Sequence, residues 1–339
     1  MVDIKSLTYE ELEEYIVQLG ESRYRAGQIF KALANGLSIS EMTNLSKALR
    51  SRLCEECIDT AAVINRDSKS RDGTRKFLYG FADGENVETV LMKYKYGNTV
   101  CVSSQAGCRM GCRFCASAVN GFRRSLSAGE ILEQVVRTRA ITGENISHVV
   151  LMGIGEPLDN FDNVIRFINI VNDSRGFGLG MRRISLSTCG LVDGIDRLAK
   201  LDLQLTLSVS LHAPNDEIRR KIMPVALRYP YESLMEACSR YEKRTGRRIS
   251  FEYAMLEGVN DSIDCANELG QRLSGTLAHV NLIPYNRVSG KNFGRSGRET
   301  IRIFAETLEK YGINTTVRRA LGSDIDAACG QLRAKNQQI

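Results

Sequence analysis

Between residues 99 and 319 the chain alternates between short apolar runs and longer amphipathic runs, and this alternation limits the possible folds more than any other feature. The short runs are rich in Val, Ile and Leu and are expected to form β-strands, and each gap is long enough for a helix. Repeated β-α units predict parallel strands with right-handed crossovers. Six or seven units are too few for a closed eight-stranded barrel, so we expect an α/β fold with an open, partial barrel. The expected strands are 99–103, 148–152, 183–187, 205–211, 249–255, 279–284 and 315–319, and the expected helices are 127–142, 161–172, 192–201, 231–245, 261–274 and 300–311.

The segments that follow these strands are unusually rich in cysteine, glycine and polar residues. In parallel β/α barrels the chemistry gathers at the carboxyl ends of the strands, so these segments are expected to meet at one rim. They are a cysteine-rich loop, Gly153-Ile154-Gly155-Glu156-Pro157, Ser187-Thr188-Cys189-Gly190, Ser210-Leu211-His212 and Pro284-Tyr285-Asn286.

The cysteine-rich loop contains Cys108, Cys112 and Cys115 in a C-x3-C-x2-C spacing. Thiolates bind zinc and iron–sulfur clusters, and both usually require four ligands. No further cysteine or histidine occurs in the next thirty residues, so three thiolates would hold three corners of a 4Fe–4S cubane and leave one iron open. The alternative is a zinc knuckle whose last ligand comes from a distant segment. The spacing resembles the signature of the radical S-adenosylmethionine (SAM) superfamily.

Composition indicates a soluble globular protein, with 43% hydrophobic and 25% charged residues among 339. No apolar run approaches the roughly 20 residues needed to cross a bilayer, and the N-terminus opens directly into an amphipathic pattern. We therefore expect a cytoplasmic protein with no membrane partner. Ten cysteines in such a protein indicate metal binding or redox chemistry rather than a disulfide framework.

The net charge is only +6, but many basic residues occur in pairs and clusters. Such clusters either lie on solvated helix faces or contact the phosphates of nucleic acid, and charge alone does not decide between these interpretations. The clusters are Arg123-Arg124, Arg182-Arg183, Arg219-Arg220-Lys221, Lys243-Arg244, Arg247-Arg248 and Arg318-Arg319.

The N-terminal part of the chain has a different pattern from the barrel. Residues 1–60 show apolar residues at helical spacing, with Gly20 and Gly36 where helices would end, which predicts a small helical module. Residues 61–94 show alternating apolar residues around two Asp-Gly turn signals, which predicts a β-hairpin extension that bridges the module and the barrel. The barrel is expected to occupy residues 95–339.

Several rim residues suit a ligand such as SAM. Gly155 would let the backbone approach a ligand closely, and Glu156 could accept hydrogen bonds from an ammonium or a ribose. The alternative is a glycine-rich turn that only ends a strand. Ser187 and Asn286 have suitable polar groups, and His212 is either a cofactor-positioning residue or a structural histidine.

Two cysteines lie apart from the cysteine-rich loop. An isolated cysteine is most often a small buried hydrophobe, and Cys101 lies on an expected strand. Cys329 is followed by Gly330 and preceded by Asp324 and Asp326, which favours an exposed, shaped loop.

Taken together, these motifs resemble the RlmN-type dual-specificity adenine-C2 methyltransferases, which act on large-subunit ribosomal RNA and transfer RNA. The resemblance covers nearly the whole chain, and it implies a partial (β/α)6 barrel of the radical SAM type with a helical N-terminal RNA-binding domain. The motifs that carry it are residues 101–108, the C-x3-C-x2-C loop, residues 153–158, Ser210-Leu211-His212 and residues 324–332.

The resemblance also implies the roles of the site residues. Cys108, Cys112 and Cys115 would hold one 4Fe–4S cluster whose open iron binds SAM. Cys329 would carry a methyl group, Cys101 would be its resolving partner and Glu88 would accept a proton. The implied SAM contacts are Gly155, Glu156, Ser187, Ser210, Leu211, His212 and Asn286.

The implied mechanism explains why two distant cysteines are needed. Adenine C2 is electron-poor and does not attack a sulfonium methyl group, so a first SAM would methylate the Cys329 thiolate. A second SAM would be cleaved to a radical that activates this methyl group for addition to C2. The resulting protein–RNA crosslink would be resolved by Cys101, which leaves a Cys101–Cys329 disulfide.

Three alternatives stay open at this point. A close relative, the chloramphenicol–florfenicol resistance enzyme, methylates adenine C8, and Pro157 favours the C2 group because the C8 enzyme tends to carry alanine there. A zinc-stabilised RNA-binding module without catalysis and a radical SAM enzyme with an unrelated substrate are the others. The implied partners are ribosomal RNA, transfer RNA and an electron donor such as flavodoxin, and the chain is expected to be a monomer.

Overall fold

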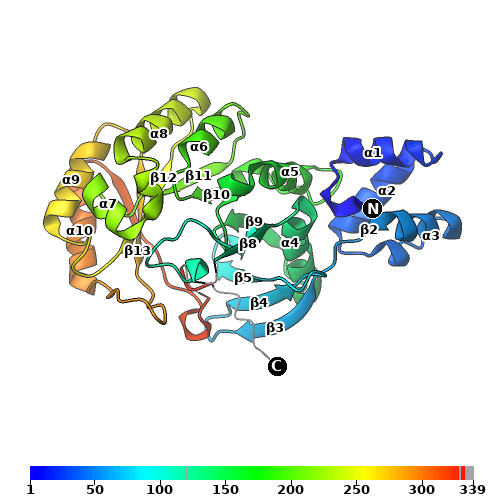
Figure 1. Cartoon of the computed structure of the whole chain (residues 1–339), viewed down its shortest axis with the longest axis horizontal. Helices are drawn as coiled ribbons and strands as arrows, with labels where there is room; N and C mark the ends of the chain where they lie inside the picture. Colours follow the sequence, from blue (N-terminus) through cyan, green and yellow to red (C-terminus); the bar gives the residue numbers. More distant parts are fainter. Residues whose placement is uncertain (120, 328–329, 333–339) are drawn as a thin grey trace.

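A single sheet of ten strands forms the centre of the molecule (Figure 1). The computed structural model describes residues 1–119, 121–327 and 330–332. Within the described residues, all seven strands expected from the sequence are present, and all of them pair in parallel as predicted. They are β6 (Gly97–Cys101), β9 (Ile146–Leu151), β10 (Ile184–Thr188), β11 (Thr206–Ser210), β12 (Ser250–Met255), β13 (His279–Pro284) and β14 (Asn314–Val317).

Six helices cover the outer face of these strands, as Figure 1 shows, and each lies where the amphipathic pattern predicts it. The start and end of α4 illustrate why. Ser127 and Glu130 form a reciprocal capping box at its first turn, and Gly143 adopts a left-handed conformation at its end. The six helices are α4 (Ala128–Thr142), α5 (Phe161–Asn172), α6 (Val192–Ala199), α8 (Tyr231–Thr245), α9 (Ile263–Leu273) and α10 (Arg298–Lys310).

One further helix was not predicted. α7 (Asp216–Ile222) lies between β11 and α8 and has only seven residues. A helix this short carries too little periodicity to be recognised from the sequence.

The β extension continues the barrel sheet. β3 (Val63–Lys69), β4 (Arg75–Gly80) and β5 (Asn86–Tyr94) pair in an antiparallel manner, and Gly73 and Gly84 have positive φ at the expected turns. β5 then pairs with β6, where Val90 is opposite Cys101. The expected hairpin is therefore correct, but it widens the barrel sheet instead of standing between the barrel and the N-terminal helices.

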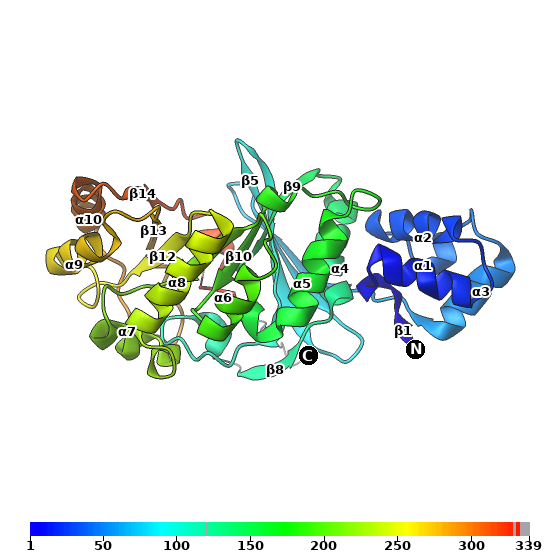
Figure 2. The same ribbon diagram turned by 90° about the horizontal axis from the view of Figure 1, so that it is seen from above.

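The N-terminal helices form a module at one end of the molecule, next to α4 (Figure 2). Leu12, Ile16 and Ile29 are fully buried in its interior. The helical pattern of the sequence thus predicted this part correctly. Its helices are α1 (Tyr9–Gln18), α2 (Tyr24–Ala34) and α3 (Lys47–Glu56), and β1 (Val2–Asp3) pairs with β2 (Cys57–Ile58).

A buried ion pair joins this module to the barrel. Lys5 Nζ lies 2.9 Å from Glu133 Oε2 on α4 and also donates to the carbonyl of Thr60 at 2.6 Å. Glu133 Oε1 accepts a hydrogen bond from the backbone N–H of Ala62 at 3.2 Å. Both charged side chains are almost completely buried, so neither can be solvated by water if its partner is removed.

We therefore expect Lys5→Met to lower the free energy of unfolding by about 3–5 kcal/mol, because it leaves the Glu133 carboxylate buried without a cation. Denaturant titration would measure the change. Lys31→Met is the matched control, since Lys31 is exposed on α2, and it is expected to change stability by no more than about 0.5 kcal/mol. Equal effects of the two substitutions would contradict the importance of the buried pair.

No helix in the described part of the chain is long and apolar enough to cross a membrane.

Candidate active site

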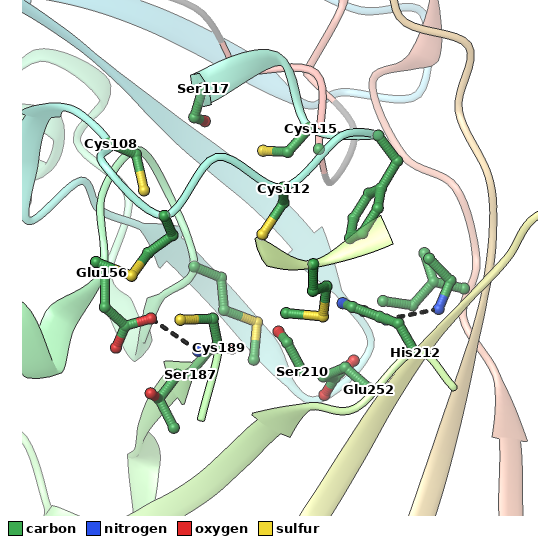
Figure 3. Close-up of a pocket in the computed structure, with 18 of the residues that line it drawn as sticks. Cys108, Cys112, Cys115, Ser117, Glu156, Ser187, Cys189, Ser210, His212 and Glu252 are labelled. Atoms are coloured by element: carbon green, nitrogen blue, oxygen red, sulfur yellow. Dashed lines mark hydrogen bonds between the residues drawn. The ribbon is translucent and has the colours of Figure 1, made fainter. Parts of the chain in front are cut away.

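A cavity of about 170 Å³ opens at the carboxyl ends of the parallel strands, on the rim that the sequence predicted (Figure 3). The cysteine loop forms one wall, and residues in or just after the last parts of β9, β10, β11, β12 and β13 form the others. The lining includes Cys108, Cys112, Cys115, Gly155, Glu156, Ser187, Ser210, His212 and Asn286, which are nine of the ten residues expected to bind the cluster or SAM. The structure therefore brings together polar groups that are far apart in the sequence.

The cysteine loop is held in place at both ends. It leaves β7 (Gln105–Gly107) and returns through β8 (Phe122–Ser125), and these two strands pair in an antiparallel manner. Gly107 has φ +76°, and any side chain there would collide with the carbonyl of Gly121. In the middle of the loop, the N–H of Arg113 donates to the carbonyl of Ile222 at the end of α7, at 2.9 Å.

The three thiols face the same cavity and influence one another. Burial raises the pKa of Cys108 to about 12 and also raises that of Cys112, and the neighbouring thiols and Glu156 act in the same direction. A bound cationic metal centre reverses this effect, because it stabilises thiolates directly. Among the described residues, no three His, Cys, Asp or Glu side chains converge closely enough to hold a single metal ion. The fit to a 4Fe–4S cluster rests on the donor type and on the shared cavity.

Glycine allows the segment after β9 to approach the cysteine loop. Gly155 has φ +109°, and a Cβ at this position would lie 2.7 Å from both Ser104 Oγ and Gln105 Cβ. The N–H of Glu156 donates to Gln105 Oε1 at 2.9 Å, which fixes the two segments together. Gly155 thus allows close contact with Ser104 and Gln105, whereas its approach to a ligand stays a prediction.

We expect Gly155→Ala to weaken SAM binding at least tenfold, because the added methyl group would push the two segments apart. Equilibrium binding to the reconstituted protein would measure the affinity. Gly246→Ala is the control, since Gly246 also has positive φ but no atom lies within 4 Å of its Cβ position. It is expected to cost about 1–2 kcal/mol of stability without changing SAM affinity. Unchanged binding in Gly155→Ala would contradict the role of the close approach.

The carboxylate of Glu156 is buried at the centre of the cavity wall. Oε1 accepts from the N–H of Leu158 at 3.0 Å, and Oε2 accepts from the N–H of Cys189 at 2.7 Å. Burial raises the pKa of Glu156, although these backbone donors oppose the shift. Each oxygen keeps acceptor capacity, so the side chain can bind a cationic or hydroxyl group of a ligand.

His212 adopts φ +56°, a conformation that is uncommon for a residue with a side chain. Its Nδ1 accepts a hydrogen bond from the N–H of Ala254 at 2.9 Å, and its ring lies edge-on to Phe114. Burial lowers the pKa of His212 to about 3, so the ring is neutral near pH 7. Since Nδ1 is the acceptor, Nε2 carries the proton and is available as a donor.

Of the ten residues expected to bind the cluster or SAM, only Leu211 does not line the cavity. Its side chain is fully buried in the hydrophobic core. Its N–H donates to the carbonyl of Glu252, and its own carbonyl accepts from Arg219 Nε at 3.3 Å.

Several polar residues of the cavity received no role from the sequence, and Cys189 and Glu252 are two of them. Cys189 belongs to the rim segment 187–190, and it is buried beside Glu156, to which its N–H donates. Glu252 is buried on β12, accepts from Asn281 Nδ2 at 2.8 Å and has a pKa raised by burial. A single acidic residue inside an apolar strand was the signal that could have identified it.

Cys101 lies at the end of β6 and faces a second cavity, of about 30 Å³. This cavity borders the first one, because both are lined by Met152, Ile283, Asn286 and Arg318. The thiol of Cys101 is therefore buried close to the candidate SAM cavity but outside its lining.

Glu88 lines a third cavity, of about 370 Å³, between the β extension and the C-terminal segment. Its Oε1 lies 3.1 Å from Lys76 Nζ, and its carbonyl accepts from Ser103 Oγ at 2.7 Å. Glu88 is two residues from Val90, the β5 partner of Cys101, so these two predicted catalytic residues lie on adjacent strands.

Cys329 lies outside the described residues, but the segments on both sides of it are described. Upstream, the β3–β4 turn binds the chain: Asp72 Oδ2 accepts from the N–H of Gly322 at 2.8 Å, and Ser70 Oγ donates to Asp324 at 2.6 Å. Downstream, the carbonyl of Gly330 accepts from the N–H of Ala116 at 2.8 Å, and Gly330 lines the first cavity.

Comparison with known proteins gives matches for both the barrel and the N-terminal module. Residues 102–265 match the radical SAM superfamily, and residues 2–58 match the ribosomal RNA large subunit methyltransferase N-terminal domain. The crystal structure of a radical SAM methyltransferase from Sphaerobacter thermophilus superimposes with a TM-score of 0.95 at 45% sequence identity, and it covers 99% of this chain and 100% of that one.

Curated relatives are similar over the same length. Proteins from Lachnospira eligens and Clostridium perfringens, both named "Probable dual-specificity RNA methyltransferase RlmN", are each 50% identical to this chain. The alignments cover 99% and 98% of this chain, respectively, and 97% of each relative.

The partial barrel, the three-cysteine loop and these matches define a radical SAM enzyme of the RNA methyltransferase class. Within that class, the chain belongs to the RlmN family.

Proposed function

We propose that this protein methylates carbon C2 of one adenosine in large-subunit ribosomal RNA and of an adenosine in the anticodon loop of transfer RNA. The cavity at the barrel rim carries this proposal, because the cysteine loop, Glu156 and His212 converge there and the cavity of Cys101 borders it. The names of the curated relatives, which describe dual-specificity RNA methyltransferases, support the substrate class.

Cys108, Cys112 and Cys115 would hold a 4Fe–4S cluster, which supplies the electron for reductive cleavage of SAM to a carbon radical. The residues of the strand ends would orient SAM. Glu156 would accept from its cationic or hydroxyl groups, and the neutral ring of His212 would donate through Nε2. The proposed SAM contacts are Gly155, Glu156, Ser187, Ser210, His212 and Asn286, and Leu211 is left out because it does not line the cavity.

Three further residues would carry the covalent chemistry. The thiolate of Cys329 would accept a methyl group from one SAM molecule, and this carbon would later form the bond to adenine C2. Glu88, whose carboxylate pairs with Lys76, would accept the proton lost from C2. Cys101 would then attack Cys329 and release methylated RNA, which leaves a disulfide between the two cysteines. Two SAM molecules would be used in each cycle.

The RNA would bind across the rim and the N-terminal module. The target adenine must leave its stack to reach the cavity, and the third cavity offers polar groups beside Glu88. Arg66 and Arg287 are exposed at this third cavity and suit phosphate contacts. Arg219 cannot contribute to such a grip, although it belongs to a basic cluster of the sequence, because its side chain is fully buried.

The cellular setting follows from the same proposal. The protein would act as a monomer in the cytoplasm and would receive electrons from a donor such as flavodoxin.

The decisive experiment is anaerobic reconstitution followed by turnover with SAM, a reductant and a ribosomal RNA fragment. Mass spectrometry against 2-methyladenosine and 8-methyladenosine standards would identify the product, and we expect only 2-methyladenosine. Formation of 8-methyladenosine would instead support the antibiotic-resistance activity of the close relative. Absence of any methylated adenosine in a cluster-loaded protein would contradict RNA methylation of these targets.

A further inference from the structure

The largest fully buried side chain of the described residues is that of Arg219, on α7. No carboxylate oxygen of the described residues lies within 4.0 Å of its guanidinium, so the charge is not neutralised by a direct ion pair. Its neighbour Arg220 is exposed and forms a surface ion pair with Asp216, one turn earlier. A buried and unpaired cation is costly, which calls for a specific explanation.

The guanidinium donates hydrogen bonds to backbone carbonyls at the ends of two strands that form the site. Nη2 donates to the carbonyl of Cys189, after β10, at 2.6 Å. Nε donates to the carbonyl of Leu211, after β11, at 3.3 Å, and Nη2 also lies 3.5 Å from the carbonyl of Ser210. One side chain therefore fixes the ends of β10 and β11, which carry Ser187 and Ser210 and precede His212.

Arg219 also lies beside the cysteine loop. α7 ends at Ile222, whose carbonyl accepts the N–H of Arg113 between the second and third cysteines. The Arg219 guanidinium is hydrogen-bonded to the carbonyl of Cys189, a residue that lines the same cavity as Cys112. Three thiolates and Glu156 would place several negative charges in this cavity, and Arg219 is a buried cation next to them.

We propose that Arg219 is a positioning residue of the active site: it holds the SAM-binding ends of β10 and β11 through their carbonyls, and it supplies the buried positive charge that favours the reduced state of the cluster. This inference rests on the proposed binding of a 4Fe–4S cluster and SAM. The reduction potential of a cluster depends on nearby charge and hydrogen bonding, so loss of a buried cation makes reduction harder.

The test compares Arg219→Lys and Arg219→Met with Arg220→Met in the reconstituted full-length protein. Circular dichroism and iron content establish that each variant is folded and loaded. Equilibrium dialysis gives the SAM dissociation constant, and a redox titration followed by electron paramagnetic resonance gives the cluster potential. We expect Arg219→Lys to weaken SAM binding about tenfold, because an ammonium cannot reach the carbonyls of both strand ends. It is expected to keep the potential close to that of the wild type, because the charge remains.

Arg219→Met is expected to weaken SAM binding by at least the same factor and to shift the potential to a more negative value. Arg220→Met is expected to change neither quantity. Wild-type SAM affinity in Arg219→Lys would overturn the positioning role, and this variant decides that question even if Arg219→Met does not fold. An unshifted potential in a folded Arg219→Met would overturn the electrostatic role. Failure of the wild-type protein to load a cluster would instead count against the proposed function itself.

Discussion

Replacing Cys112 by alanine is expected to convert a brown, iron-containing protein into a colourless one that forms no methylated RNA. The thiol lies on the loop that faces the main cavity, and without it only two of the three loop thiolates remain to hold the cubane. Cys108→Ala and Cys115→Ala are expected to behave in the same way. Iron and sulfide analysis after anaerobic reconstitution would show about four irons for each wild-type chain and almost none for the variants.

Cys54→Ala is the matched control for this experiment. Cys54 is exposed on α3 in the N-terminal module, far from the barrel rim, and its removal is expected to preserve both iron and activity. A wild-type protein that binds zinc and stays colourless would support the noncatalytic RNA-binding module. Retention of four irons in Cys112→Ala would show that the cluster is held elsewhere.

The second large effect concerns the two cysteines outside the cluster loop. Cys329→Ala is expected to keep its cluster and to abolish methylation, because no thiol remains to accept the first methyl group. Cys101→Ala is expected to stop later in the cycle and to accumulate a covalent protein–RNA adduct, because no thiol remains to resolve it. Denaturing gel electrophoresis with labelled RNA would detect the adduct, and mass spectrometry of the digested band would locate the attachment at Cys329.

The double variant Cys101→Ala, Cys329→Ala is the control, and it is expected to form no adduct. Full methylation by Cys329→Ala would contradict the proposed carrier role and would favour a radical SAM enzyme with a different route to its product. An adduct that persists in the double variant would place the attachment on another residue.

The barrel could be predicted from the sequence because its strands and helices are encoded locally. Buried parallel strands read as continuous apolar runs, and the helices between them carry their own start and stop signals, such as the Ser127–Glu130 capping box. The cysteine loop was equally clear, since its three cysteines are close in the sequence. Its position over the strand ends could then be predicted, because in parallel β/α barrels the functional loops follow the carboxyl ends of the strands.

The features that could not be predicted depend on tertiary packing, which decides whether a given side chain faces the interior or the solvent. Arg219 and Arg220 are adjacent in the sequence, yet one is fully buried and the other lies in solvent, and a helix of seven residues gives no pattern that distinguishes them. The pairing of β5 with β6 determines that the extension widens the barrel sheet, and the hairpin turns do not reveal this. The separation of Cys101 into a neighbouring cavity likewise depends on tertiary packing.

The ten strands of the large sheet lie side by side in the same order as they occur in the chain, from β3 to β14. During synthesis, each strand that leaves the ribosome therefore meets an edge formed by the strand made just before it. In this sheet no strand has to wait for a partner later than the next strand of the sheet, and the growing edge is covered step by step as translation proceeds. The segment that carries Cys329 emerges after all ten strands, when the wall beside which its thiol would react under the proposed function is already complete.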